Sequence, residues 1–340
     1  MGNFWQQLKK PFFCLAPMEE VTDFAFREII ARYSGEISNS KSQAPSRNNF
    51  VLFTEFVNVD GLLHPEGQKK LLIDLKYSEI QRPIVAQLWG TDPKKFHDAA
   101  KFIKKLGFDG IDINMGCPQA KEIAIGACAA LIRQPDLARE IIIATKEGAG
   151  NIPVSVKTRI GYSKPEEMEE WVATVLETEP AVLILHGRTK KEMSKVPAHW
   201  DRVAGAVRLR DKVQGNRDKE GKTLIVGNGD VRSYEEGLER VKETGVDGIM
   251  IGRGAFGDPW VFNPKTCQHG AKERLRVMLE HARLFCDTFA GQKHFMVMRK
   301  HFKAYASGFD GAHELRAKLM EAGDLEETER IVEEFLSDNL

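Results

Sequence analysis

Short apolar segments recur along the chain and alternate with stretches in which apolar residues return at helical spacing. Most of these segments lack the alternation of a half-exposed strand, and continuous apolar runs are typical of parallel strands buried on both faces. We predict eight strands, at Phe12–Met18, Val51–Val57, Ile84–Trp89, Gly110–Met115, Val154–Arg159, Val182–His186, Thr223–Asn228 and Gly248–Gly252. Eight strand–helix alternations favour an α/β fold, a closed (β/α)8 TIM barrel, over an open sheet.

The pattern changes after Asn263–Gly270, which has the composition of a linker. Beyond it the apolar residues keep helical spacing without a strand signal. We predict helices at Arg274–Phe289, Lys293–Ser307, Ala312–Glu321 and Leu325–Leu336. The chain is therefore expected to have a barrel domain over residues 1–265 and a smaller C-terminal all-helical domain over residues 266–340.

Composition constrains the partners, the metal content and the location of the protein less strongly than the pattern of elements constrains its fold. The 49 basic and 49 acidic side chains cancel, so net charge neither supports nor excludes a nucleic-acid partner. The five cysteines form no CxxC pair, so we expect no metal site and a cytoplasmic protein with reduced thiols. We recognise no signal peptide and no apolar run of about 18 residues, so no membrane association is expected.

Polar residues gather where the predicted strands end. A single polar residue at a strand end is readily explained as a core group whose hydrogen bonds are satisfied. Several together are not, because the carboxyl ends of barrel strands meet at one rim, where active sites form. The polar strand ends are Thr54-Glu55, Gln87, Asn114 to Pro118, Lys157 to Arg159, His186 to Thr189, Gly227 to Asp230 and Gly252 to Gly254. This clustering predicts an active site at that rim.

The last two strand ends are glycine-rich turns. Loops after strands seven and eight of such barrels often bind a phosphate through backbone N–H groups. Gly229 and Gly252 permit close approach and Arg253 adds positive charge, although each turn alone is equally well explained as a tight turn. The spelling GxGxxG at Gly252 to Gly257 is not a Rossmann fingerprint, because helices rather than a further strand follow it.

Cys117 leaves a buried strand for a loop, so its thiol is expected to face the cleft rather than the core. In that position it fits either a nucleophile or a proton donor. Cys128 follows eleven residues later and is predicted to be a packing residue.

Taken together, these strand ends resemble the tRNA dihydrouridine synthase family over nearly the whole chain. The central motif is DGIDINMGCP at Asp109 to Pro118. The other matching motifs, in family order, are Pro17-Met18 with Val21 to Asp23 and Phe26-Arg27, Gln87-Leu88 with Gly90, Lys121 with Gly126, Lys157 with Arg159, His186 to Thr189, Ala198 with Trp200, Asn228 to Asp230, Gly252 to Gly254 with Pro259-Trp260, and Met298 to His301.

The resemblance implies FMN as cofactor, NADPH as reductant, and reduction of the C5–C6 double bond of a uridine in tRNA by a monomeric enzyme. It implies that hydride passes from flavin N5 to C6, that Cys117 gives the proton to C5, and that Asn114 faces the uracil. A thiol in this role must be protonated when it acts. The implied cofactor-binding residues are Ala16, Pro17 and Met18 beside the ring, Gln87, Lys157 and His186 on the ring, and Asn228, Gly229, Asp230, Gly252 and Arg253 near the phosphate.

Two positions depart from the family pattern. Glu192 and Ser194 stand where the family usually has a glutamine and an aromatic residue, and Glu122 stands where an apolar residue is usual. The first departure bears on base contact, and the second on the packing of the loop that carries Cys117.

The helical domain contains a basic stretch from Lys293 to Lys303 without an acidic residue. A solvated helix face is a common explanation for such a stretch, but its Met298–His301 segment matches the family. We expect RNA contacts from Arg299, Lys300, His301 and Lys303.

Two other functions compete with this one. A barrel flavoenzyme that acts on a free pyrimidine or another small enone would keep the barrel and the phosphate site, but would not need the basic helical domain. An RNA-binding protein without catalysis would not need Cys117, Lys157 and His186.

Overall fold

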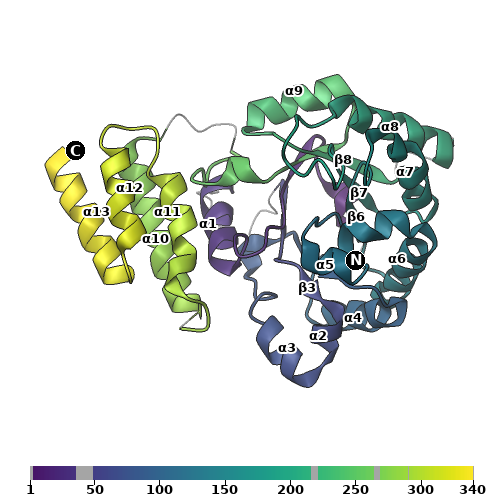
Figure 1. Ribbon diagram of the computed structural model, residues 1–340, viewed down its shortest axis with the longest axis horizontal. Helices are drawn as coiled ribbons and strands as arrows, with labels where there is room; N and C mark the ends of the chain where they lie inside the picture. Colours follow the sequence, from purple (N-terminus) through teal and green to yellow (C-terminus); the bar gives the residue numbers. More distant parts are fainter. Residues whose placement is uncertain (1–2, 36–48, 216–220, 264–268, 290, 340) are drawn as a thin grey trace.

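Parallel strands close into a barrel in the computed structural model, which describes residues 3–35, 49–215, 221–263, 269–289 and 291–339 (Figure 1). The sheet order is β2-β1-β9-β8-β7-β6-β5-β4-β3, and β2 also pairs with β4, which closes the ring. The strands are β1 (Phe12–Leu15), β2 (Phe50–Phe53), β3 (Val57–Asn58), β4 (Ile84–Trp89), β5 (Gly110–Met115), β6 (Val154–Arg159), β7 (Val182–His186), β8 (Leu224–Asn228) and β9 (Gly248–Ile251). The predicted (β/α)8 barrel is confirmed.

One predicted strand is interrupted. Residues 50–53 and 57–58 both pair with β4, so β2 and β3 occupy one position of the barrel. Between them Glu55 turns its buried carboxylate towards the backbone N–H of Glu20, at 2.5 Å, and the Nζ of Lys293, at 2.7 Å. These partners are distant in sequence, which is why the apolar pattern alone predicted one continuous strand.

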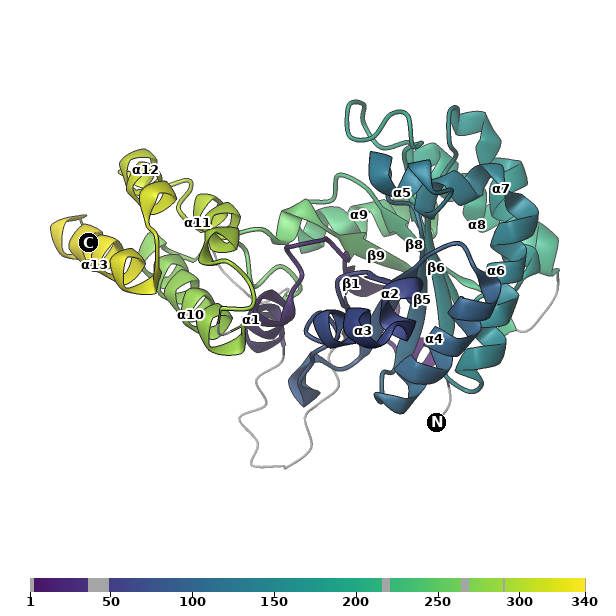
Figure 2. The ribbon, with the colours of Figure 1, turned by 60° about the horizontal axis from the view of Figure 1, so that its bottom comes forward.

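Helices cover the outside of the barrel (Figure 2). They are α1 (Phe24–Ser34), α2 (Val59–Leu63), α3 (Pro65–Leu71), α4 (Pro93–Lys105), α6 (Pro135–Ala149), α7 (Met168–Glu177), α8 (Trp200–Gln214) and α9 (Tyr234–Thr244), whereas α5 (Ala120–Ala124) lies at the carboxyl rim (Figure 2). At the amino end of the strands, the fully buried Trp5 packs with Phe12 and Phe53, and these apolar side chains help to fill the barrel interior. The carboxyl ends carry the polar residues instead, so the open rim lies there.

The C-terminal helices form a separate cluster beside the barrel (Figure 1). They are α10 (Ala271–Phe289), α11 (Arg299–Tyr305), α12 (Ala312–Glu321) and α13 (Leu325–Asn339). Their shared apolar core includes Ala25 and Ile29 of α1, so α1 joins the two domains. The proposed boundary at residues 265 and 266 lies outside the described residues. No helix in the described ranges combines the length and apolar character needed to span a bilayer.

His301 lies inside this junction and not on the surface, so the expectation that it contacts RNA is wrong. Its side chain is fully buried, with its ring 5.2 Å from that of Phe26 and 4.7 Å from that of His281. Neither ring nitrogen of His301 or of His281 has a hydrogen-bond partner within the described part of the chain. Burial lowers the pKa of His281 to about 3 and the pKa of His301 well below its ordinary value.

Replacing His301 by Phe is expected to make the protein less sensitive to acid. The unfolded chain protonates this histidine near pH 6.5 whereas the folded chain keeps it neutral, so its contribution to stability is present above about pH 6.5 and is lost as pH falls. Each pH unit below that value costs about 1.4 kcal/mol. Urea unfolding at pH 7, 6 and 5 measures the effect, with the exposed His313→Gln as control. Parallel pH dependences in His301→Phe and the parent would contradict this account.

Candidate active site

Two neighbouring hollows open at the carboxyl ends of the strands. The larger, of about 650 Å³, lies over the ends of β6 to β9, and the second, of about 610 Å³, lies over the ends of β4 to β6. Both have the size of small-molecule sites. They share Pro17, Met18, Pro118, Lys157 and Arg159, and so form one continuous cleft.

The predicted barrel residues all lie in this cleft. The larger hollow is lined by Ala16, Pro17, Met18, Lys157, His186, Asn228, Gly229, Asp230, Gly252 and Arg253, and the second by Gln87, Asn114 and Cys117. The cleft also contains Arg159 and Arg188, which sequence reasoning left out of the site although both stand in motifs that it used. Their signal was their position, Arg159 as the last residue of β6 and Arg188 two residues after the end of β7.

The turn after β8 needs a glycine. Gly229 has a φ of +131°, and a Cβ there would lie 2.8 Å from the Cβ of Ala198 and 3.2 Å from the His186 ring. A Cβ at Gly252 would make only ordinary contacts, the nearest at 3.5 Å from Ala16. Close approach of a ligand to the backbone therefore depends on Gly229.

Asp230 orients two arginines at this end of the cleft. Its carboxylate accepts hydrogen bonds from Arg188, from the N–H of Ala198 at 3.0 Å, and from Arg253 at 3.0 Å. Burial alone would raise the pKa of Asp230, but the hydrogen bonds from Arg188 and Ala198 outweigh it and lower that pKa. The arrangement leaves the Arg253 side chain 69% exposed at the mouth of the larger hollow.

The floor of the cleft is positively charged. Burial, and then repulsion from Arg159, lowers the pKa of Lys157 to about 8. Burial, and then the charges of Arg159 and Lys157, holds the pKa of His186 well below its ordinary value, so this imidazole is neutral at pH 7. Together with Arg188 and Arg253, these side chains suit an anionic ligand.

Cys117 is half-buried at the second hollow, on a turn that Asn114 holds. The Asn114 Oδ1 accepts the N–H groups of Gly116 and Cys117, each at 3.0 Å. Cys128 is fully buried, as predicted, and its thiol also contacts that of Cys117. It has a φ of +55°, a region that non-glycine residues seldom occupy.

The contact with Cys128 bears on the protonation of Cys117. The hydrogen bond from the Cys128 thiol is the largest influence on Cys117 and lowers its pKa, whereas burial and the nearby Glu122 act in the opposite direction. Since a proton donor must hold its proton, the first influence opposes that role and the other two favour it.

Comparison with known proteins decides the family. The model of the dihydrouridine synthase family matches residues 14–340. The chain belongs to the dihydrouridine synthase family. A probable tRNA-dihydrouridine synthase of Staphylococcus aureus (strain COL) is 41% identical over 98% of this chain and 95% of its own length. The probable tRNA-dihydrouridine synthase 2 of Bacillus subtilis (strain 168) is 39% identical over 98% and 96%.

Solved structures agree on the fold alone. The histamine dehydrogenase of Rhizobium sp. 4-9 matches 80% of this chain and 48% of its own length, with a TM-score of 0.50 and 15% identity. At that identity the likeness supports the barrel and says nothing of chemistry.

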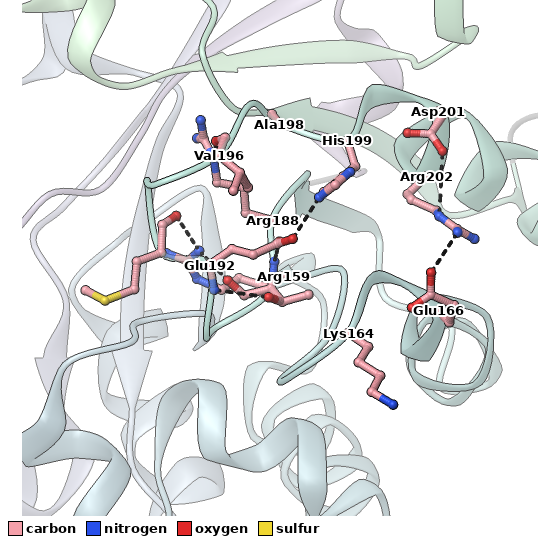
Figure 3. Close-up of polar contacts among 12 residues, drawn as sticks. Arg159, Lys164, Glu166, Arg188, Glu192, Val196, Ala198, His199, Asp201 and Arg202 are labelled. Carbon is pink, nitrogen blue, oxygen red and sulfur yellow. Dashed lines mark hydrogen bonds and ion pairs between the residues drawn. The ribbon is translucent and has the colours of Figure 1, made fainter.

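The departure of this chain from the family pattern at Glu192 has a local structural role (Figure 3). The Glu192 carboxylate accepts the N–H of Thr189 at 2.8 Å and lies 2.9 Å from the Nε2 of His199. The Glu192 carboxylate therefore stabilises the loop between Thr189 and His199 that carries it. Ser194, the other changed residue of that loop, lines the larger hollow.

Arg159 connects this loop to the turn of Cys117. Its Nε donates to the carbonyl oxygen of Gly116 at 2.7 Å, and its Nη1 donates to that of Thr189 at 3.2 Å. Glu122, the second departure from the family pattern, is buried in the Cys117 loop, and its Oε2 has no hydrogen-bond partner among the described residues.

The basic stretch of the helical domain is largely engaged with the protein. Lys293 bridges Glu55 and Asp74, at 2.7 and 2.9 Å. Arg299 donates to the carbonyl oxygens of residues 321 and 322 at the end of α12. Lys303 is exposed.

Lys300 lies beside the cleft. Its Nζ donates to the backbone oxygen of Glu20 at 2.9 Å and to the carboxylate at 3.1 Å. Glu20 lines the hollow that contains Cys117, so α11 adjoins the edge of the site.

Proposed function

We propose that the chain is a tRNA-dihydrouridine synthase that reduces the C5–C6 double bond of a uridine in tRNA, with FMN as cofactor and NADPH as reductant. One observation carries the proposal. A single cleft joins a basic, glycine-lined end at Gly229 and Arg253 to a half-buried thiol at Cys117. Family membership and the names of the relatives support the same reaction.

The residues of the larger hollow fit FMN. The phosphate would be held by backbone N–H groups at Gly229 and Gly252 together with Arg253, because the Gly229 turn has no room for a side chain. The isoalloxazine ring would lie along Ala16 to Met18, with Gln87, Lys157 and His186 at its edges. Bound FMN would supply the hydride for C6 of the uracil.

The chain's own residues would then complete the reduction. Lys157 would stabilise negative charge at the ring edge, since it is a cation that lines both hollows of the cleft. Asn114 lines the second hollow, where a flipped-out uracil would lie. The Cys117 thiol would donate its proton to C5 and be left as a thiolate.

A direct assay tests this function against a small-molecule reductase. The purified protein, reconstituted with FMN, is incubated with NADPH and either unmodified tRNA or free uridine, and the products are analysed by mass spectrometry. We expect a gain of two hydrogens at uridine in tRNA only. Reduction of free uridine at an equal rate would instead support a small-molecule enzyme, and no product from either substrate would oppose both.

Lys303→Glu is expected to weaken tRNA binding, because Lys303 is an exposed cation on α11, the helix that adjoins the cleft. Reversing a charge that contacts a phosphate lowers the dependence of binding on salt by about one unit of slope. Filter binding over a range of salt concentrations measures this, with Lys272→Glu on α10 as a surface control. Equal affinity and slope in Lys303→Glu and the parent would exclude Lys303 from the RNA contact.

A further inference from the structure

Asp112 is a buried acid that neither hollow exposes. It lies in the middle of β5 and is fully buried. Its Oδ1 accepts a hydrogen bond from the Ser155 hydroxyl at 2.5 Å, and its Oδ2 accepts one from the Nε2 of Gln87 at 2.7 Å. Burying a carboxylate costs free energy that an apolar residue at the same barrel position would not cost. The presence of Asp112 therefore calls for a functional explanation.

These bonds fix the direction of a longer chain of hydrogen bonds. An ionised carboxylate only accepts, so Gln87 must present its Nε2 to Asp112 and its Oε1 to the other side. There the Oε1 accepts from the Nδ2 of Asn114 at 3.1 Å. Asn114 in turn presents its Oδ1 to the N–H groups of Gly116 and Cys117. In this orientation of the Gln87 and Asn114 amides, each N–H donor of these contacts faces an acceptor.

The opposite orientation would fail at both ends. If Gln87 turned over, its Oε1 would face the Asp112 carboxylate and its Nε2 would face the Nδ2 of Asn114. If Asn114 turned as well, its Nδ2 would face two backbone donors. Each mismatch strands a buried polar group, which costs more than a hydrogen bond contributes.

We propose that Asp112 is a positioning residue, which sets the amide orientations of Gln87 and Asn114 and thereby holds the turn that presents the Cys117 thiol. Its consequence for turnover rests on the proposed function. Asp112 touches neither hollow and acts through Gln87, whereas Gln87 and Asn114 both line the cleft.

The charge state of Asp112 suits this role. Burial raises its pKa to about 6, while the hydrogen bonds from Ser155 and Gln87 and the charge of Lys157 act to lower it. The carboxylate is therefore ionised at pH 7 and above, where it can only accept. Lys157 lies one strand away in register with Asn114, and Ser155 in register with Asp112.

Hydrogen exchange in the flavin-free protein tests the structural step. Asp112→Leu removes the acceptor, and we expect amide exchange in the peptide around Gly116 and Cys117 to become about tenfold faster, as for the loss of one hydrogen bond. Asp112→Asn should exchange like the parent, because its Oδ1 still accepts from Gln87 while its Nδ2 donates to Ser155, whose hydroxyl can rotate. Ser155→Ala is the matched control and should leave this peptide unchanged.

Turnover tests the catalytic step. In the loaded enzyme Asp112→Leu should lower kcat for uridine reduction by about 10- to 10²-fold, since small misplacements of reacting groups have effects of this size. The KM for tRNA should stay within about twofold of the parent, because the expected contacts of the tRNA with basic residues lie on α11. Asp112→Asn should restore kcat.

A second pair of variants covers the case in which Asp112→Leu does not fold. Gln87→Met breaks the same chain of hydrogen bonds. The double variant Gln87→Met with Asp112→Leu removes both the Gln87 amide and the Asp112 carboxylate, so neither group is left buried without its partner. If Asp112 acts through Gln87, the double variant should exchange at the rate of Gln87→Met.

Three results would overturn the proposal. The first is a folded Asp112→Leu whose amide exchange and kcat match those of the parent. The second is a loss of kcat in Asp112→Asn equal to that in Asp112→Leu. The third is amide exchange that is faster in the double variant than in Gln87→Met alone. A parent protein that forms no dihydrouridine would remove the proposed function, yet the exchange comparison in the flavin-free protein would still decide the role of Asp112.

Discussion

Replacing Cys117 by alanine is expected to lower the rate of uridine reduction in tRNA by about 10² to 10⁴-fold, the usual effect of losing a positioned general acid. The variant should still bind FMN and be reduced by NADPH, because Cys117 lies at the second hollow, away from the basic end at Arg253. Stopped-flow bleaching of the flavin by NADPH, followed by reoxidation with tRNA, separates the two steps. Only reoxidation by tRNA should become slow.

Cys128→Ala is the matched control, since it removes the other thiol of the contacting pair. It should retain most of its turnover, because Cys128 is fully buried and has no access to substrate. It should also raise the pKa of Cys117, whose lowering depends first on the Cys128 hydrogen bond. A slower alkylation of Cys117 at pH 7.5 would report this. If Cys128→Ala lost turnover as severely as Cys117→Ala, the assignment of the donor would be wrong.

The barrel was predictable because parallel buried strands have a simple pattern. Four predicted strands, Ile84–Trp89, Gly110–Met115, Val154–Arg159 and Val182–His186, have the boundaries found in the structure. Each carries a polar rim residue within its last three positions, namely Gln87, Asn114, Lys157 and His186, so the change in polarity marks the approaching end. The same rule located the rim residues, because consecutive strands of a parallel barrel all deliver their ends to one side.

Partners distant in sequence account for what was missed. Asp112 looks like a polar intrusion in an apolar strand until Gln87 and Ser155 are placed beside it. Arg188 acquires its role from Asp230, which is 42 residues away. No local pattern carries this information.

His301 was misassigned although a local signal existed. It adjoins an apolar stripe formed by Met298, Phe302 and Tyr305, which return at helical spacing and are all buried. Arg299 and Lys303, four residues apart, share the other face. Counting charge along the segment hid this division, whereas reading it by helix face predicts a buried histidine.

Arg253→Glu is expected to weaken FMN binding by about 10² fold or more. Losing a hydrogen bond to a charged group costs roughly 1.5–3 kcal/mol, or about 10- to 10²-fold in affinity, and reversing the charge adds repulsion at the phosphate. Asp230 increases this effect. It keeps its bond to Arg188 but loses Arg253, so two carboxylates then stand at the mouth of the hollow. Fluorescence titration of the flavin-free protein with FMN measures the affinity.

Two variants calibrate that measurement. Arg253→Lys keeps the charge and should bind FMN within about tenfold of the parent, because lysine replaces the planar guanidinium with a point charge. Arg202→Glu reverses a partly exposed arginine that pairs with Glu166 instead of lining the hollow, and it should leave FMN affinity unchanged (Figure 3). Riboflavin, which lacks the phosphate, should bind Arg253→Glu and the parent with similar affinity. If Arg253→Glu weakened riboflavin as much as FMN, the arginine would support the fold of the rim rather than the phosphate.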